Sequence, residues 1–194
     1  MTILRFQAWE GNEARSIEGE DFVRFLDGCF ARSTAIALTK DCVRTSWYQK
    51  TGSLERALLP WLSRKFLAKR WFGYAPARAI HDPPFEIEVQ LYPASDEVKR
   101  AILACYQDLF LSYPLREGDG GAEGKYCYAL GDLSFFRGDR MFLGTVSHES
   151  ICMAQPIDSD LRGFLHAFGA WVPETDEDVD FICLSDREEK GGAV

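Results

Sequence analysis

The segment Ser147-His148-Glu149-Ser150-Ile151-Cys152 holds the residue types that acid–base and nucleophilic catalysis use. Imidazole, carboxylate and thiol groups at this spacing could move protons or attack a substrate. The segment is expected between two strands, where adjacent side chains point to opposite faces, so His148 and Glu149 would not readily share one site. A zinc protease motif also needs a second histidine where Cys152 stands. His148 is therefore a catalytic candidate, and the alternative is a local packing or hydrogen-bonding role at a bend.

The six cysteines, at positions 29, 42, 105, 127, 152 and 183, contain no C-x-x-C pair of the kind that indicates a zinc or redox site. We interpret them as reduced thiols that mostly fill the core. A Cys–His pair could still form in three dimensions from these thiols and the three histidines. The glycine-rich segment 117–125 is not a phosphate loop, because Asp119 stands where that loop needs its first glycine. We therefore expect neither a metal nor a cofactor.

A different kind of site is indicated by Trp171, which precedes an acidic run made of Glu174, Asp176, Glu177, Asp178 and Asp180. An aromatic anchor surrounded by carboxylates is typical of a surface that binds a basic protein. The run lacks the central glycine of a calcium loop, so calcium binding does not explain its carboxylates. The alternative is that Trp171 packs the end of the preceding helix onto the core.

Charge is distributed unevenly along the 194 residues. The whole chain has a net charge of −8, and residues 101–194 alone hold 17 acidic and 7 basic side chains, for a net charge of −10. Such a surface repels nucleic acid and attracts a basic protein partner. No apolar run approaches the roughly 20 residues of a membrane span, and the N-terminus lacks the pattern of a signal peptide. We expect a cytoplasmic protein that binds neither nucleic acid nor a membrane.

Apolar residues recur at strand spacing in some segments and at helix spacing in others. Strands are expected over 3–9, 85–91, 126–130, 133–137, 140–146, 151–154 and 179–184, with turns at 131–132 and 138–139. Helices are expected over 20–37, 53–70, 95–110 and 159–168, with a kink at Pro60. Because βαβ alternation is absent, the predicted fold class is α+β, a mostly antiparallel sheet that includes a C-terminal meander, with helices packed against it. One domain, 1–194, is expected, in which 117–125 could join two subdomains and 185–194 forms a flexible tail.

Three parts of the chain give this layout a resemblance to a known family. They are LRFQAWEGNEARS followed by FVRFL, then SWYQKTGSLERAL, and finally LSFFRGDRMFLGTVSHES. The layout resembles that of bacterial toxin-immunity proteins, which are often acidic, cytoplasmic α+β domains without a catalytic motif. The resemblance implies that the chain neutralises a toxin by covering its active site, and it transfers no site residue.

The sequence therefore favours a non-enzymatic protein-binding domain, an immunity protein that binds and neutralises a bacterial toxin. Two alternatives stay open. One is a small hydrolase or transferase that uses His148 or a Cys–His pair. The other is a regulatory module that binds a small ligand.

Overall fold

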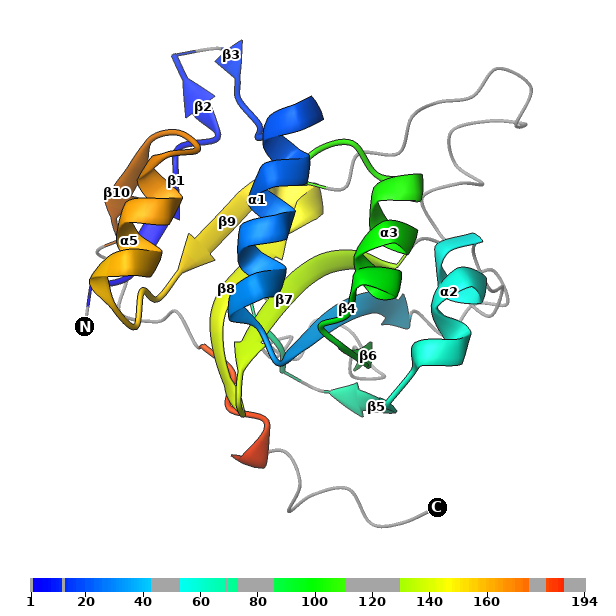
Figure 1. Cartoon of the computed structure of the whole chain (residues 1–194). Coiled ribbons are helices and arrows are strands. Elements are labelled where there is room, and N and C mark those ends of the chain that lie inside the picture. Colours follow the sequence, from blue (N-terminus) through cyan, green and yellow to red (C-terminus); the bar gives the residue numbers. More distant parts are fainter. Residues whose placement is uncertain are drawn as a thin grey trace.

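The structure is a computed structural model that describes residues 2–11, 13–42, 53–68, 70–72, 86–110, 130–174 and 181–186. Its main element is an eight-stranded sheet in the order β10-β1-β9-β8-β7-β4-β6-β5, in which neighbouring strands are antiparallel (Figure 1). Its strands are β1 (Leu4–Phe6), β4 (Ala35–Cys42), β5 (Arg64–Ala68), β6 (Glu86–Pro93), β7 (Gly131–Arg137), β8 (Arg140–Val146), β9 (Ile151–Ala154) and β10 (Trp171–Pro173). A separate hairpin pairs β2 (Trp9–Glu10) with β3 (Glu13–Ala14).

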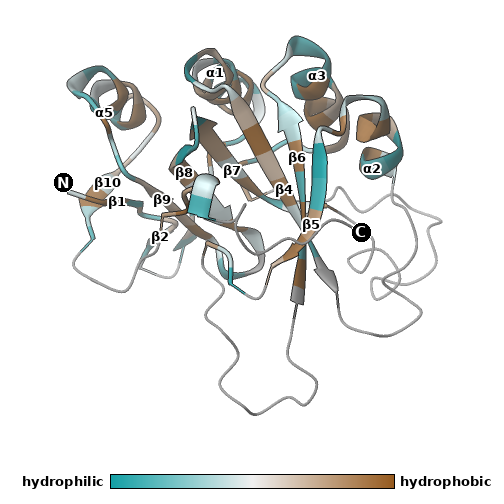
Figure 2. Cartoon of the chain, turned by 90° about the horizontal axis from the view of Figure 1, so that it is seen from below, coloured by the Kyte–Doolittle hydropathy of each residue, from teal (hydrophilic) through white to brown (hydrophobic). Residues whose placement is uncertain are grey.

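The four α-helices of the described residues lie on the same face of this sheet (Figure 2). They are α1 (Gly19–Arg32), α2 (Ser53–Leu58), α3 (Asp96–Cys105) and α5 (Ser159–His166). The short 3-10 helices η2 (Leu59–Trp61) and η3 (Ser147–Glu149) connect elements of the described chain. This arrangement confirms the predicted α+β class with a mostly antiparallel sheet.

Local capping explains where two of the helices begin. The Ser95 side chain accepts a hydrogen bond from the backbone N–H of Val98, and Asp158 accepts one from Leu161 at 2.7 Å. Such caps satisfy N–H groups that the first helical turn leaves without a partner. These starts are the ones that the sequence predicts for both helices.

The main core lies between the helices and the sheet. The inward faces of α1, α3 and α5 meet alternate residues of the strands, and the buried members include Phe22, Phe25, Ile36, Ile102, Phe135 and Leu165. A second cluster covers the opposite face of the sheet, where Trp71, Phe72 and Ile182 are buried against Val89 and Phe136. Both faces of the central strands are therefore covered, which is why almost every residue of β7 and β8 is buried, on whichever face it lies.

Two strands overlap segments for which the sequence predicts helix, β4 at residues 35–37 and β5 over its whole length. The first helix ends at Arg32 rather than at position 37, and residues 35–42 form β4, which pairs with both β6 and β7. The second ends at Leu58, and after Pro60 residues 64–68 form β5 against β6. A short apolar run fits a buried strand and a helix equally well, so only the pairing partners decide between them.

The last part of the chain also differs from its prediction. Residues 181–184, predicted to end a strand, make only an isolated bridge between Cys183 and Arg140. Gly131-Asp132 begins β7 instead of forming a turn, whereas Gly138 does turn the chain between β7 and β8 with a φ of 63°. The predicted flexible tail begins at residue 185, but the structure fixes this residue: the Ser185 hydroxyl donates a hydrogen bond to the Asp139 carboxylate at 2.9 Å. The predicted connector 117–125 and positions 187–194 lie outside the described residues.

Gly28 allows α1 and α5 to approach each other closely. A Cβ at this position would lie 2.1 Å from the Phe164 ring, which stacks on Phe25 at 5.6 Å and is covered by the Arg32 guanidinium at 4.5 Å. Because the ring is held from both sides, we expect Gly28→Ala to lower the free energy of unfolding by about 1–3 kcal/mol, although alanine is the better helix former. Urea denaturation of Gly28→Ala, Phe164→Ala and the double variant measures this. The loss should shrink in the Phe164→Ala background, and a Gly28→Ala protein more stable than the parent would contradict the clash.

Candidate functional site

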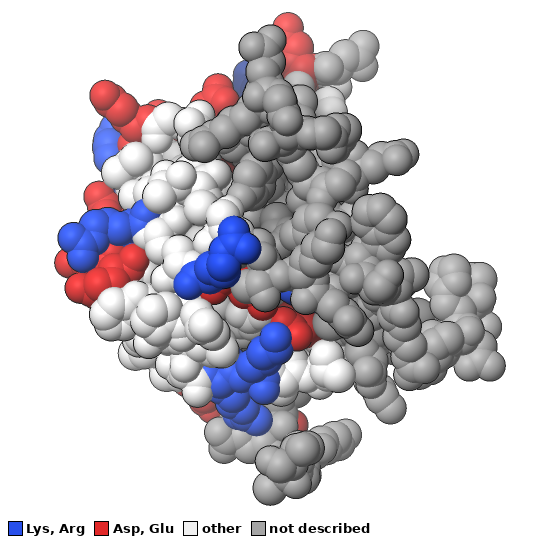
Figure 3. All heavy atoms as spheres, turned by 90° about the vertical axis from the view of Figure 1, so that its right-hand side faces the viewer, with Lys and Arg blue, Asp and Glu red and all other residues white. Residues whose placement is uncertain are grey.

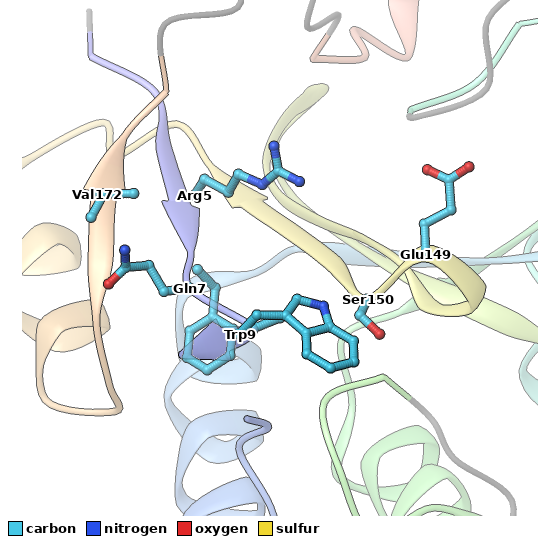
Figure 4. A pocket seen from close by; sticks show the side chains of 8 residues that line it. Arg5, Gln7, Trp9, Glu149, Ser150 and Val172 are labelled. Carbon is cyan, nitrogen blue, oxygen red and sulfur yellow. The ribbon is translucent and has the colours of Figure 1, made fainter. Parts of the chain in front are cut away.

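A surface hollow of about 270 Å³ lies where β1, β2, β10 and η3 meet (Figure 4). It brings together two segments that the sequence keeps far apart, the N-terminal strand and the turn after β8. Its lining residues are Arg5, Phe6, Gln7, Ala8, Trp9, Glu149, Ser150 and Val172. In Figure 4 the Trp9 ring extends toward Ser150, and Arg5 extends from β1 in the direction of Glu149.

Side chains alternate along residues 4–7, so that two of them pack in the core and two lie on the outer face of the sheet. Leu4 and Phe6 are buried, with 2% and 4% of their surface exposed, so Arg5 and Gln7 point outward. β1 is held on both sides, by β9 and by β10. The opposite wall is built by Ser150, whose φ of 53° ends η3 and turns the chain into β9. The hollow is therefore fixed by sheet pairing and one left-handed turn.

Trp9 is the prominent side chain of this site, because 58% of its surface is exposed. The β2–β3 hairpin holds it there: Arg15 forms an ion pair with Glu10, and the Arg15 N–H donates to the Ala8 carbonyl at 2.7 Å. A large aromatic group that is exposed on an ordered hairpin can be buried by a partner at a small entropic cost.

The charges beside the hollow are mixed, with an acidic excess. Arg5 forms an ion pair with Glu174 at 3.3 Å, and the Glu174 side chain is only 10% exposed. The hairpin adds Glu10 and Glu13, and η3 adds Glu149, all of them exposed. Two ion pairs, Arg5 with Glu174 and Arg15 with Glu10, therefore lie at this end of the molecule, together with the carboxylates of Glu13 and Glu149.

The structure corrects the predicted role of Trp171. This residue is 4% exposed and lies in the main core, where its ring meets Phe6 edge-to-face at 5.5 Å. A partner cannot reach an indole in that position, so Trp171 packs the sheet edge instead of forming a surface anchor. Of the acidic run, Glu174 is tied to Arg5, and Asp176, Glu177, Asp178 and Asp180 lie outside the described residues.

The predicted catalytic candidates are not brought together among the described side chains. His148 belongs to η3, but its side chain lies outside the described part, and His166 is exposed at the end of α5. Burial raises the pKa of the Cys29 thiol well above its ordinary value, and burial together with the nearby Cys29 does the same for Cys152. A buried, protonated thiol is a poor nucleophile. Both cysteines therefore fill the core, as the sequence predicts.

Among the described residues, no group of three His, Cys, Asp or Glu side chains is placed to hold a metal ion. The helices described are also too short or too polar to cross a bilayer.

Comparison with protein-family models, with curated proteins and with solved structures finds no match to this chain. Function is therefore inferred from the geometry and charge of the site itself.

Trp9 is the site residue that the sequence interpretation missed. The predicted strand 3–9 places Leu4, Phe6 and Ala8 on one face and Arg5 and Gln7 on the other. Continuing that alternation puts Trp9 on the polar face, where a tryptophan is unusual and therefore informative. The contribution of Glu149 and Ser150 could not be found in this way, because it depends on the pairing of β1 with β9.

Proposed function

We propose that this protein is a non-catalytic protein-binding domain, an immunity protein that binds and neutralises a bacterial toxin. The observation that carries the proposal is the exposure of Trp9 on an ordered hairpin, beside a hollow whose charged lining residues are Arg5 and Glu149. Tryptophan is the residue most enriched among binding hot spots, and surrounding charges steer the encounter. Trp9 takes the anchor role that the sequence assigned to Trp171, and Glu149 in the hollow and Glu13 on the hairpin take the steering role of the acidic run.

The net charge of −8 supports a basic partner, since opposite charges accelerate association. A toxin that acts on nucleic acid carries a basic active site, and an acidic inhibitor complements such a site. The proposal predicts a toxin-like reading frame directly upstream of this chain, and its product is the partner to test.

We expect Trp9→Ala to weaken binding to that toxin by about 2 kcal/mol or more, roughly a 30-fold rise in Kd, mainly through faster dissociation. The Glu13→Gln, Glu149→Gln double variant should instead slow association and reduce its salt dependence. Surface plasmon resonance measures both rates, and growth of cells that express the toxin tests neutralisation. Ile157→Ala is the control, because Ile157 is a 39% exposed apolar side chain that does not line the hollow.

Unchanged kinetics in the folded Trp9→Ala protein would exclude the hollow as the binding site. Failure of the parent protein both to bind the upstream toxin and to protect cells from it would contradict the immunity function.

A further inference from the structure

We propose that Asp132, a buried residue at the start of β7, is a positioning residue that holds the wall of the hollow formed by Glu149 and Ser150 in place for the toxin. Asp132 has this role only if the toxin binds at the Trp9 hollow, so the proposal rests on the function proposed above. The hydrogen bonds of Asp132, its backbone conformation and its place in the sheet support this role.

Asp132 and Ser147 join the ends of β7 and β8 where the backbone ladder between these strands gives way to side chains. In that ladder the pair nearest to Asp132 is Ser134–Gly144. Beyond this pair, the Asp132 N–H donates to the Ser147 hydroxyl at 3.3 Å, and the Ser147 N–H donates in return to the Asp132 carboxylate at 2.6 Å. The chain that leaves β8 is therefore held to β7 by a reciprocal pair of hydrogen bonds.

The Asp132 carboxylate also links η3 to the centre of the sheet. One of its oxygens accepts the N–H of Ser147, the first residue of η3, and the other accepts the Thr39 hydroxyl of β4 at 3.0 Å. Asp132 and Thr39 are both buried, so water competes little for these bonds. Hydrogen bonds to a carboxylate are also stronger than those between neutral groups. The point at which η3 begins is thus fixed from β4 as well as from β7.

Backbone strain is concentrated on the same turn. Two non-glycine residues of the described chain have a positive φ, Asp132 with 49° and Ser150 with 53°. Such conformations cost free energy and persist where the surrounding structure holds them, often at binding sites. Asp132 bonds the first residue of η3, and Ser150 follows its last residue. Both strained residues therefore determine the path of η3.

The hollow explains what this support does for binding. Glu149 and Ser150 line the hollow, and the Trp9 ring extends toward Ser150 (Figure 4). A wall that already has its bound position loses less conformational entropy when the toxin binds. Without the Asp132 carboxylate, η3 would be free to move, and the toxin would have to order it.

Two substitutions separate the carboxylate from the backbone conformation. Glycine adopts a φ of 49° without strain, so Asp132→Gly removes the side-chain bonds alone. Asparagine also tolerates this conformation, and its amide oxygen still accepts the Ser147 N–H in Asp132→Asn. We expect hydrogen exchange of the Ser147 amide in the free protein to be at least about tenfold faster in Asp132→Gly. In Asp132→Asn it should stay close to that of the parent.

The upstream toxin measures the consequence for binding. By surface plasmon resonance, Asp132→Gly should raise the Kd about tenfold, whereas Asp132→Asn should keep the affinity of the parent. The loss should shrink in a Glu149→Ala background, because the two residues act on the same wall. A general loss of stability would instead lower the affinity equally in both backgrounds.

Glu97→Gln is the matched control, since it also removes one negative charge. Glu97 belongs to α3, which lies on the opposite side of Figure 1 from β1 and β10. Figure 3 faces this far side of the molecule, where the described acidic and basic side chains lie next to one another. The Ser147 exchange rate and the Kd of Glu97→Gln should equal those of the parent.

Unchanged Ser147 exchange in Asp132→Gly would overturn the positioning role without any toxin, as would an Asp132→Asn protein that loses as much as Asp132→Gly. A parent-like Kd of Asp132→Gly for a toxin that Trp9→Ala binds weakly would also overturn it, and the proposed function would then stand. If the parent protein binds no toxin, the proposed function fails, and the role of Asp132 in binding fails with it.

Discussion

Replacing Lys40 with methionine is expected to lower the free energy of unfolding by about 3–5 kcal/mol, because it leaves a buried carboxylate without its nearest positive charge. The Lys40 ammonium lies 2.8 Å from a Glu55 oxygen, and the two side chains are only 7% and 9% exposed. The other Glu55 oxygen accepts a hydrogen bond from the Gln90 amide at 2.9 Å. Lys65 is more distant, at 3.9 Å, and half-exposed. Urea denaturation monitored by circular dichroism measures the loss.

This pair belongs to a network that holds α2 on the sheet. The Tyr92 hydroxyl donates a hydrogen bond to the side-chain oxygen Oε1 of Gln90 at 2.5 Å. The side-chain nitrogen Nε2 of Gln90 also donates to the Glu88 carboxylate at 2.6 Å. Glu55 is supplied by α2, Lys40 by β4, and the remaining groups by β6. Removing one member therefore leaves several buried polar groups without their hydrogen-bond partners, and buried groups of this kind lower the stability of the fold.

The loss should depend on pH. Burial raises the pKa of the Glu55 carboxyl, but the hydrogen bonds from Lys40 and Gln90 and the charges of Lys40 and Lys65 outweigh it, so the pKa lies below the ordinary 4.5. A depressed folded-state pKa gives stability that is complete above about pH 4.5 and is lost as the pH falls through the folded-state value. The difference between the parent and Lys40→Met should accordingly be largest at neutral pH and shrink in acid.

Two further variants separate this explanation from a general loss of packing. The double variant Lys40→Met, Glu55→Met removes both charges and should recover much of the stability that Lys40→Met loses. Lys99→Met breaks the Lys99–Asp27 pair, in which Asp27 is 52% exposed, and should cost at most about 1 kcal/mol. If Lys40→Met costs no more than Lys99→Met, the buried pair does not stabilise the fold as described.

The second large effect is expected at Trp171. We expect Trp171→Ala to lower the free energy of unfolding by about 3–5 kcal/mol, because it empties a core position at the edge of the sheet. The indole packs edge-to-face on Phe6 and is 4% exposed. Thermal and urea unfolding measure the change.

Trp171→Phe and Trp9→Ala are the matched comparisons. The Trp171 N–H is buried with no hydrogen-bond partner among the described residues, so phenylalanine keeps much of the packing and removes an unsatisfied donor. Trp171→Phe should therefore lower the free energy of unfolding much less than Trp171→Ala does. Trp9→Ala should leave stability within about 0.5 kcal/mol, since an exposed side chain contributes little to folding. Equal losses of stability in Trp171→Ala and Trp9→Ala would contradict the burial of Trp171 and the exposure of Trp9.

The sequence alone predicted the fold class and several elements, because these depend on local patterns. Apolar and polar residues alternate over 85–91, and the observed strand β6 covers most of that range. The hairpin between β7 and β8 follows from Gly138, and the starts of α3 and α5 follow from Ser95 and Asp158. In each case the residue that sets the conformation is within a few positions of the element that it controls.

Tertiary structure decided which apolar segments become strands. Residues 35–42 and 64–68 carry too little local pattern to distinguish a helix from a strand, and they pair as β4 and β5 because β6 lies between them. Lys40 is buried for the same reason, since the pairing places it under α2, where Glu55 compensates its charge. No local rule predicts a lysine in that position.

The candidate site was decided in the same way. Trp9 and Trp171 are both tryptophans beside acidic residues in the sequence, yet one is 58% and the other 4% exposed. The difference arises because β10 pairs with β1 and turns Trp171 onto Phe6, whereas the β2–β3 hairpin leaves the sheet and carries Trp9 to the surface. Burial is a property of the partners that a side chain meets, and those partners come from distant parts of the chain.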